Sequence, residues 1–206
     1  MHTTLHKIRP CGLPAGNITW PVADADVLVG AAIVHLLPPK DVRTNINDYA
    51  EHVFMPYIRQ RLQNVKRLDV VWDRYIEKSL KQGMRESRGS GERRRVTKTT
   101  PLPTNWSSFL KVDINKEELF NFLAVHIGKE KPLDGKELVS TFGTGVKCTR
   151  VDKDTSKPEP FTHEEAETQM MIHVADCVAQ GYAKVTIRTV DTDVVVLLAQ
   201  ERHSDT

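Results

Sequence analysis

Acidic residues follow two apolar segments of this 206-residue chain. Asp73 comes after LDVVW, and Asp191 and Asp193 come after AKVTIRTV. Residues two apart on an extended segment face the same side, so Asp191 and Asp193 can reach one point together. Glu165 and Glu167 stand in FTHEEAET, which opens an expected helix. If the two apolar segments are strands that lie side by side, the three aspartates meet at one edge of a sheet.

Carboxylates that converge in this way need a cation. Two unit charges about 4 Å apart repel by roughly 4 kcal/mol at an effective dielectric of about 20, so several of them must be protonated or bind a metal ion. Oxygen ligands suit Mg²⁺ or Mn²⁺, and a pair of such ions is the usual device for hydrolysing phosphodiesters. The spacing therefore favours a site for one or two divalent ions, with these ligands: Asp73, Glu165, Glu167, Asp191 and Asp193.

Each acidic group also has an ordinary structural interpretation. Thr162 to Glu165 form a good capping box, and acids in a first turn complement the helix dipole. Asp191 and Asp193 equally fit a turn at a strand end, and Asp73 fits a helix N-cap. A metal site differs from these alternatives only if Asp73, the Glu165/Glu167 pair and the Asp191/Asp193 pair all converge on one point.

Positive charge is concentrated in one region of a chain whose formal net charge is only +2. Between residues 74 and 98 there are nine Lys or Arg against three Glu, and four of the cations are spaced as on one helix face that begins beside Asp73. Such a stripe is either a solvated face or a contact for nucleic-acid phosphates. Next to a metal site we expect DNA or RNA to bind these residues: Lys78, Lys81, Arg85, Arg88, Arg93, Arg94 and Arg95.

The order of the segments predicts an α/β fold. The segments Val27–Leu36, Leu68–Trp72 and Ala183–Val190 read as buried strands, and Asn47–Val65, Phe109–Leu123 and Glu164–Gln180 read as helices. Alternation around Gly143-Thr144-Gly145 predicts a β-hairpin insertion over residues 136–151. We therefore expect a mostly parallel central sheet flanked by helices, with the functional site outside the carboxyl ends of the strands.

Composition agrees with one globular domain, since 39% of the residues are hydrophobic and 27% are charged. We expect residues 1–26 to form an irregular lead-in and residues 27–206 to form the domain. Three scattered cysteines indicate a reducing compartment, nuclear or cytoplasmic. The longest apolar run, VLVGAAIVHLL, is too short to span a bilayer, so no membrane partner is expected.

Three successive patterns resemble the PIN-like nuclease superfamily, specifically its flap endonuclease-like branch: DVVWDRYIEKSLKQGMRESRG, HEEAET and VDTDVVVL. The likeness is closest to uncharacterised animal proteins often associated with mobile elements, and it covers most of Val27 to Leu198. It implies a PIN-like fold and metal-dependent cleavage of DNA or RNA. By motif match, the five acidic residues named above are the metal ligands, and Lys81 and Arg88 are the catalytic cations that approach the scissile phosphate.

Two departures from the family pattern qualify what the resemblance implies. The family places an aspartate at the end of its first strand, in a pattern like V-I-D-G-A, where this chain has Val29. Asp24 and Asp26 precede that position and would need a different backbone path to replace the missing acid. The chain also stops at Thr206, before the family's further acidic segment. These features imply a fragment or a degenerate copy, and the alternative function is a non-catalytic scaffold that binds nucleic acid or protein.

Overall fold

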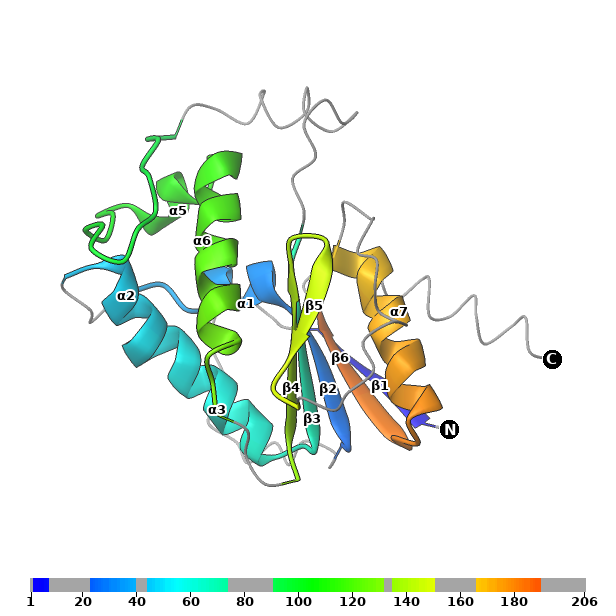
Figure 1. Ribbon diagram of the computed structural model, residues 1–206. Coiled ribbons are helices and arrows are strands. Elements are labelled where there is room, and N and C mark those ends of the chain that lie inside the picture. Colours follow the sequence, from blue (N-terminus) through cyan, green and yellow to red (C-terminus); the bar gives the residue numbers. More distant parts are fainter. Residues whose placement is uncertain are drawn as a thin grey trace, which may run out of the picture.

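The computed structural model describes residues 2–7, 23–39, 44–73, 91–131, 135–150 and 166–189. These residues form a six-stranded sheet with helices on both faces (Figure 1). The strands are β1 (His2–Lys7), β2 (Ala25–Val29), β3 (Arg67–Val71), β4 (Glu137–Phe142), β5 (Gly145–Cys148) and β6 (Lys184–Thr189). The helices are α1 (Gly30–Leu36), α2 (Ile46–Tyr49), the π-helix η1 (Ala50–Phe54), α3 (Met55–Gln63), α5 (Trp106–Phe109), α6 (Asp113–Ile127) and α7 (Ala166–Ala179).

The sheet order is β1-β6-β2-β3-β4-β5. The strands from β1 to β4 in this order pair in parallel, and only β5 is antiparallel to its neighbour. This arrangement confirms the predicted α/β class and the mostly parallel sheet. The condition that β3 and β6 lie side by side is not met, because β2 lies between them. All three strands nevertheless end at the same edge of the sheet, since they run in parallel.

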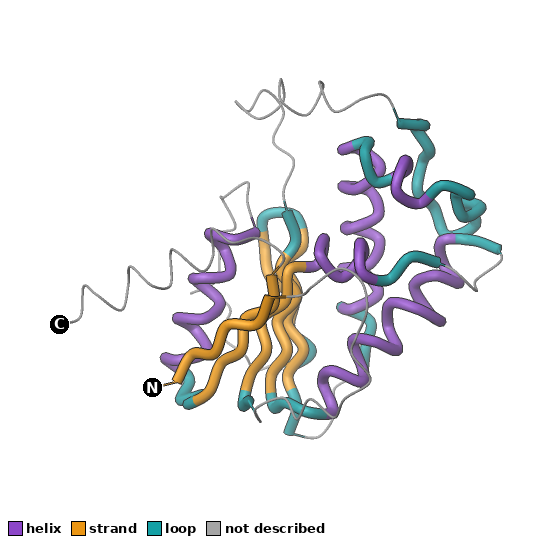
Figure 2. Tube along the Cα trace, turned by 180° about the vertical axis from the view of Figure 1, so that it is seen from behind, coloured by secondary structure: helices purple, strands orange, loops and turns teal. Residues whose placement is uncertain are grey.

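Alternating side chains of the central strands pack against different helices. Leu28 and Val70 belong to the larger core beneath α1, η1, α3 and α6, whereas Val27 and Val71 belong to a smaller core beneath α7. Figures 1 and 2 show the resulting three layers, with α7 alone among the described helices on its face of the sheet. No described helix has the length and apolar character needed to cross a bilayer.

Several local signals produced the expected elements. The hairpin of β4 and β5 turns at Gly143, whose φ of 59° lies in the left-handed region that glycine favours. Gly181, with φ of 87°, follows the end of α7. Asn45 accepts a hydrogen bond from the Asp48 amide at 3.0 Å and caps α2. The predicted helix over Asn47–Val65 is realised as α2, η1 and α3 in succession.

The predicted strand Val27–Leu36 is wrong from Gly30 onward. Strand β2 ends at Val29, and α1 begins at Gly30. A Cβ atom at Gly30 would lie 2.3 Å from Cε3 of Trp72, so the missing side chain lets the indole pack directly on the backbone at this junction. A short apolar run does not distinguish a buried strand from a buried helix, and this run contains both.

Two other expectations also need correction. The lead-in over residues 1–26 is not irregular throughout, because His2–Lys7 form β1 in parallel register with β6, and Ala25 already belongs to β2. Strand β1 is held by backbone pairing at the sheet edge, which its HTTLHK sequence signals only weakly. The helix expected over Phe109–Leu123 lies later, as α6, and is preceded by the separate turn α5.

Candidate metal centre

Asp73 lies just beyond the carboxyl end of β3 and contacts the start of α7. Its Oδ1 accepts a hydrogen bond from the backbone N–H of Ala166 at 3.3 Å, across 93 positions of sequence. Ala166 stands between Glu165 and Glu167 in the sequence, so Asp73 contacts the middle residue of the E-A-E segment. A carboxylate at this position also interacts favourably with the helix dipole of α7.

The other predicted ligands are described only in part. Strand β6 ends at Thr189, next to β2 and at the same edge of the sheet as Asp73, and Asp191 follows two positions later in the sequence. Glu167 belongs to the first turn of α7. The following predicted site residues lie outside the described part of the chain: Lys78, Lys81, Arg85, Arg88, Glu165, Asp191 and Asp193.

Val29 occupies the middle of this edge. It is the last residue of β2, pairs in register with Val71, and is 3% exposed within the core beneath α7. The position where the family pattern has an acid is therefore apolar and packed. Asp26 is three residues earlier, about 10 Å along the strand, and pairs with Arg188 at 3.3 Å. Asp24 precedes β2 and contacts Lys66 at 3.4 Å, so both aspartates lie too far back on the strand to replace the missing acid.

In the Arg93-Arg94-Arg95 loop, one ion pair joins Arg93 to α6 and another joins Arg94 to Glu92, two residues earlier. Arg93 Nη2 donates to Glu118 at 2.6 Å, and Arg94 Nη2 donates to Glu92 at 3.0 Å. Burial alone would raise the pKa of Glu118, but hydrogen bonds from Val96 N and Arg93 outweigh it, so the pKa is lowered. A nucleic-acid phosphate would have to compete with these carboxylates for Arg93 and Arg94. Their predicted role as phosphate contacts stays a prediction.

A buried charged network, formed by Arg67, Asp69, His173 and Asp176, joins β3 to α7. Arg67 donates to both oxygens of Asp69 at 2.7 Å, and its Nη1 lies 2.7 Å from Asp176 Oδ2. His173 Nδ1 lies 2.6 Å from Asp69 Oδ2. Each of the four residues is at most 2% exposed. This network was not predicted from the sequence, although Arg67-x-Asp69 in a buried strand places two charges on one face.

The network keeps Asp69 ionised. Burial would raise the pKa of this carboxyl, but the charge of Arg67 and the hydrogen bonds from His173 and Arg67 lower it to about 2. Burial likewise opposes the charge on Arg67, while Asp69 raises the pKa of the guanidinium. Because an ionised carboxylate only accepts hydrogen bonds, Nδ1 of His173 carries a proton. Charge pairing therefore holds α7 to the sheet below the Asp73 contact.

Comparison with protein-family models, with curated proteins and with solved structures finds no match to this chain. Within the described residues, no group of three or more His, Cys, Asp or Glu side chains is placed to hold a metal ion. Of the five predicted ligands, only Asp73 has a described side chain. The structure thus establishes the α/β fold class.

Proposed function

We propose that this chain is a PIN-like, flap endonuclease-like domain that hydrolyses DNA or RNA phosphodiesters with the help of divalent metal ions. The contact of Asp73 with Ala166 is the observation that supports it most strongly. That contact joins two of the three acidic motifs at the carboxyl edge of a parallel sheet, where such folds place their functional sites. Strand β6, which precedes the third motif in the sequence, ends at the same edge.

In this proposal the carboxylates hold one or two Mg²⁺ or Mn²⁺ ions. The donor set is composed of carboxylate oxygens, which suits these hard ions. Once bound, the metal ions would supply an activated water and stabilise the leaving oxygen. Lys81 and Arg88 hold the scissile phosphate, and the remaining basic residues bind the nucleic-acid backbone. Asp73 has a second role, because its hydrogen bond to Ala166 positions the start of α7.

Val29 favours a second candidate, a non-catalytic scaffold that retains the fold and binds nucleic acid or protein. A buried valine at the end of the central strand supplies no ligand between Asp73 and the chain that follows β6. A scaffold has no need of metal ions. The two candidates therefore differ in whether divalent ions are required for their action on nucleic acid.

A cleavage assay tests the proposed activity. The chain is incubated with Mn²⁺ and end-labelled single-stranded or flapped DNA and RNA, beside Asp191→Asn/Asp193→Asn and the control Glu117→Gln. Glu117 is an exposed carboxylate on α6 and is not among the predicted ligands. We expect cleavage by the parent and the control and none by the double variant. Full activity in the double variant refutes the ligand assignment, and metal-independent binding without cleavage supports the scaffold.

A further inference from the structure

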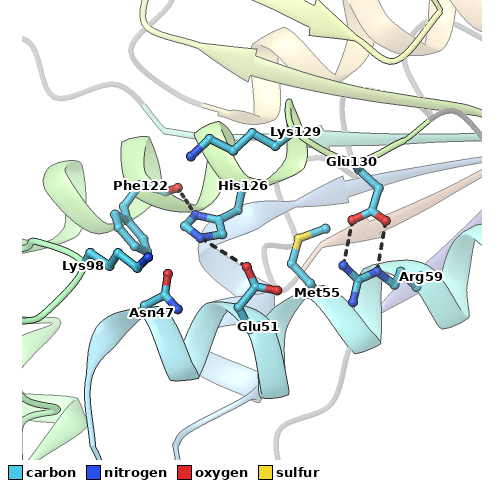
Figure 3. A pocket seen from close by; sticks show the side chains of 9 residues that line it. All are labelled: Asn47, Glu51, Met55, Arg59, Lys98, Phe122, His126, Lys129 and Glu130. Atoms are coloured by element: carbon cyan, nitrogen blue, oxygen red, sulfur yellow. Dashed lines mark hydrogen bonds and ion pairs between the residues drawn. The ribbon is translucent and has the colours of Figure 1, made fainter.

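A pocket of about 320 Å³ lies between α6 and the helical stretch formed by η1 and α3 (Figure 3). Met55, which is 1% exposed, and Phe122 contribute its apolar lining. All the other side chains that line it are polar or charged. None of them belongs to the carboxyl edge of the sheet, so the pocket is separate from the proposed metal centre.

One pair of opposite charges in the pocket is satisfied internally. Arg59 Nε and Nη2 donate to the two carboxylate oxygens of Glu130 at 3.1 and 2.9 Å. Lys98 and Lys129 form no ion pair within the described part of the chain, and Figure 3 shows Lys98 at the end of the pocket opposite the Arg59–Glu130 pair. The lining has three cations against two carboxylates, so positive charge is in excess even when His126 is neutral. The pocket is therefore suited to an anion.

His126 directs one ring nitrogen into the pocket. Its side chain is 10% exposed, and Nδ1 lies 3.0 Å from the carbonyl oxygen of Phe122. Because a carbonyl oxygen only accepts, Nδ1 carries a proton, and Nε2 points toward Glu51. The distance from Nε2 to Glu51 Oε1 is 3.6 Å, which is too long for a hydrogen bond. Both atoms are then acceptors, and a ligand hydroxyl placed here can donate its one proton to either the carboxylate or Nε2.

We propose that this pocket binds a phosphate monoester that carries hydroxyl groups and is of about mononucleotide size. The phosphate contacts Lys98 and Lys129, because its oxygens accept charge-assisted hydrogen bonds from both ammonium groups. A hydroxyl lies between His126 and Glu51, and the rest of the ligand packs on Phe122. A free mononucleotide and a sugar phosphate share this chemistry.

Calorimetric titration with adenosine 5′-monophosphate tests the proposal. It is run in EDTA, so the result does not depend on the proposed metal centre. Lys98→Met and Lys129→Met each remove one charge-assisted hydrogen bond, and we expect each to weaken binding about fivefold to tenfold. Lys111→Met is the matched control, since Lys111 is exposed and outside the pocket. Adenosine lacks the phosphate, so its affinity relative to the monophosphate gives the contribution of the phosphate. Ribose 5-phosphate lacks the base, so its affinity gives the contribution of the base in the same way.

Distinct outcomes separate the possibilities. Binding of the monophosphate that is weakened by both pocket substitutions and unchanged by Lys111→Met supports the site, and similar affinity for ribose 5-phosphate then identifies a sugar phosphate as sufficient. The proposal is overturned if the parent does not bind at millimolar monophosphate, if adenosine binds equally well, or if all three lysine variants behave alike. Both pocket lysines are exposed, so these variants are expected to fold normally.

Discussion

Replacing Arg67 by Met would remove the only guanidinium from a buried network that contains two carboxylates. Asp69 and Asp176 are at most 2% exposed, and both lie 2.7 Å from Arg67 nitrogens. Breaking a buried pair by removing one partner typically costs about 3 to 5 kcal/mol, because the remaining charge is left without compensation. We expect Arg67→Met to lower the free energy of unfolding by that amount, measured by urea denaturation.

Two further variants show whether uncompensated charge is the cause. Adding Asp69→Asn and Asp176→Asn to Arg67→Met removes the carboxylates, and we expect this triple variant to recover at least about half of the lost stability. Arg59→Met breaks a half-exposed ion pair with Glu130 and is expected to cost at most about 1 kcal/mol. The reasoning is refuted if Arg67→Met costs no more than Arg59→Met, or if the triple variant is less stable than Arg67→Met.

Two other predictions follow from individual contacts. Gly30→Ala places a Cβ about where the Trp72 ring lies, 2.3 Å from Cε3, and is expected to lower the free energy of unfolding by about 1 to 3 kcal/mol through overpacking; a loss below about 0.5 kcal/mol in urea denaturation would contradict the close packing. The pKa of Asp69 is about 2 in the folded chain, against an ordinary value of 3.8, so its stabilisation is complete above about pH 4 and is lost as the pH falls toward 2. The stabilisation amounts to about 2 kcal/mol. It is measured as the loss in the free energy of unfolding on acidification, compared between the parent and Asp69→Asn. An equal loss in the two proteins would show that Asp69 is not the group responsible.

The elements with clear periodicity or turn residues could be predicted from the sequence. Strand β3, strand β6 and the hairpin at Gly143 all occur where the pattern indicated. The end of β2 could not be predicted, because Trp72 packs against Gly30 there, and Trp72 follows β3 much later in the sequence. Strand β1 could not be predicted either, since its stability comes from pairing with a strand at the other end of the chain.

The candidate site shows the same division between local and long-range information. Asp73 at a strand end was evident from LDVVW followed by an acid, and the structure places it against the E-A-E segment. The role of Arg67 was not evident, because its partner Asp176 and the Asp69 partner His173 are about a hundred residues away and on a helix. A charge pair at i and i+2 in an otherwise apolar strand was the available signal.

The most direct test of the proposed metal centre is a calorimetric titration with Mn²⁺ of the parent and Asp73→Asn. Asparagine keeps an oxygen that can accept the hydrogen bond from Ala166, so it removes the carboxylate charge with little change to the contact between β3 and α7. We predict that the parent binds Mn²⁺ and that Asp73→Asn binds at least about tenfold more weakly, a difference of about 1.4 kcal/mol. Equal binding by the two proteins, or no binding by the parent, would contradict a metal centre at the carboxyl edge of this sheet.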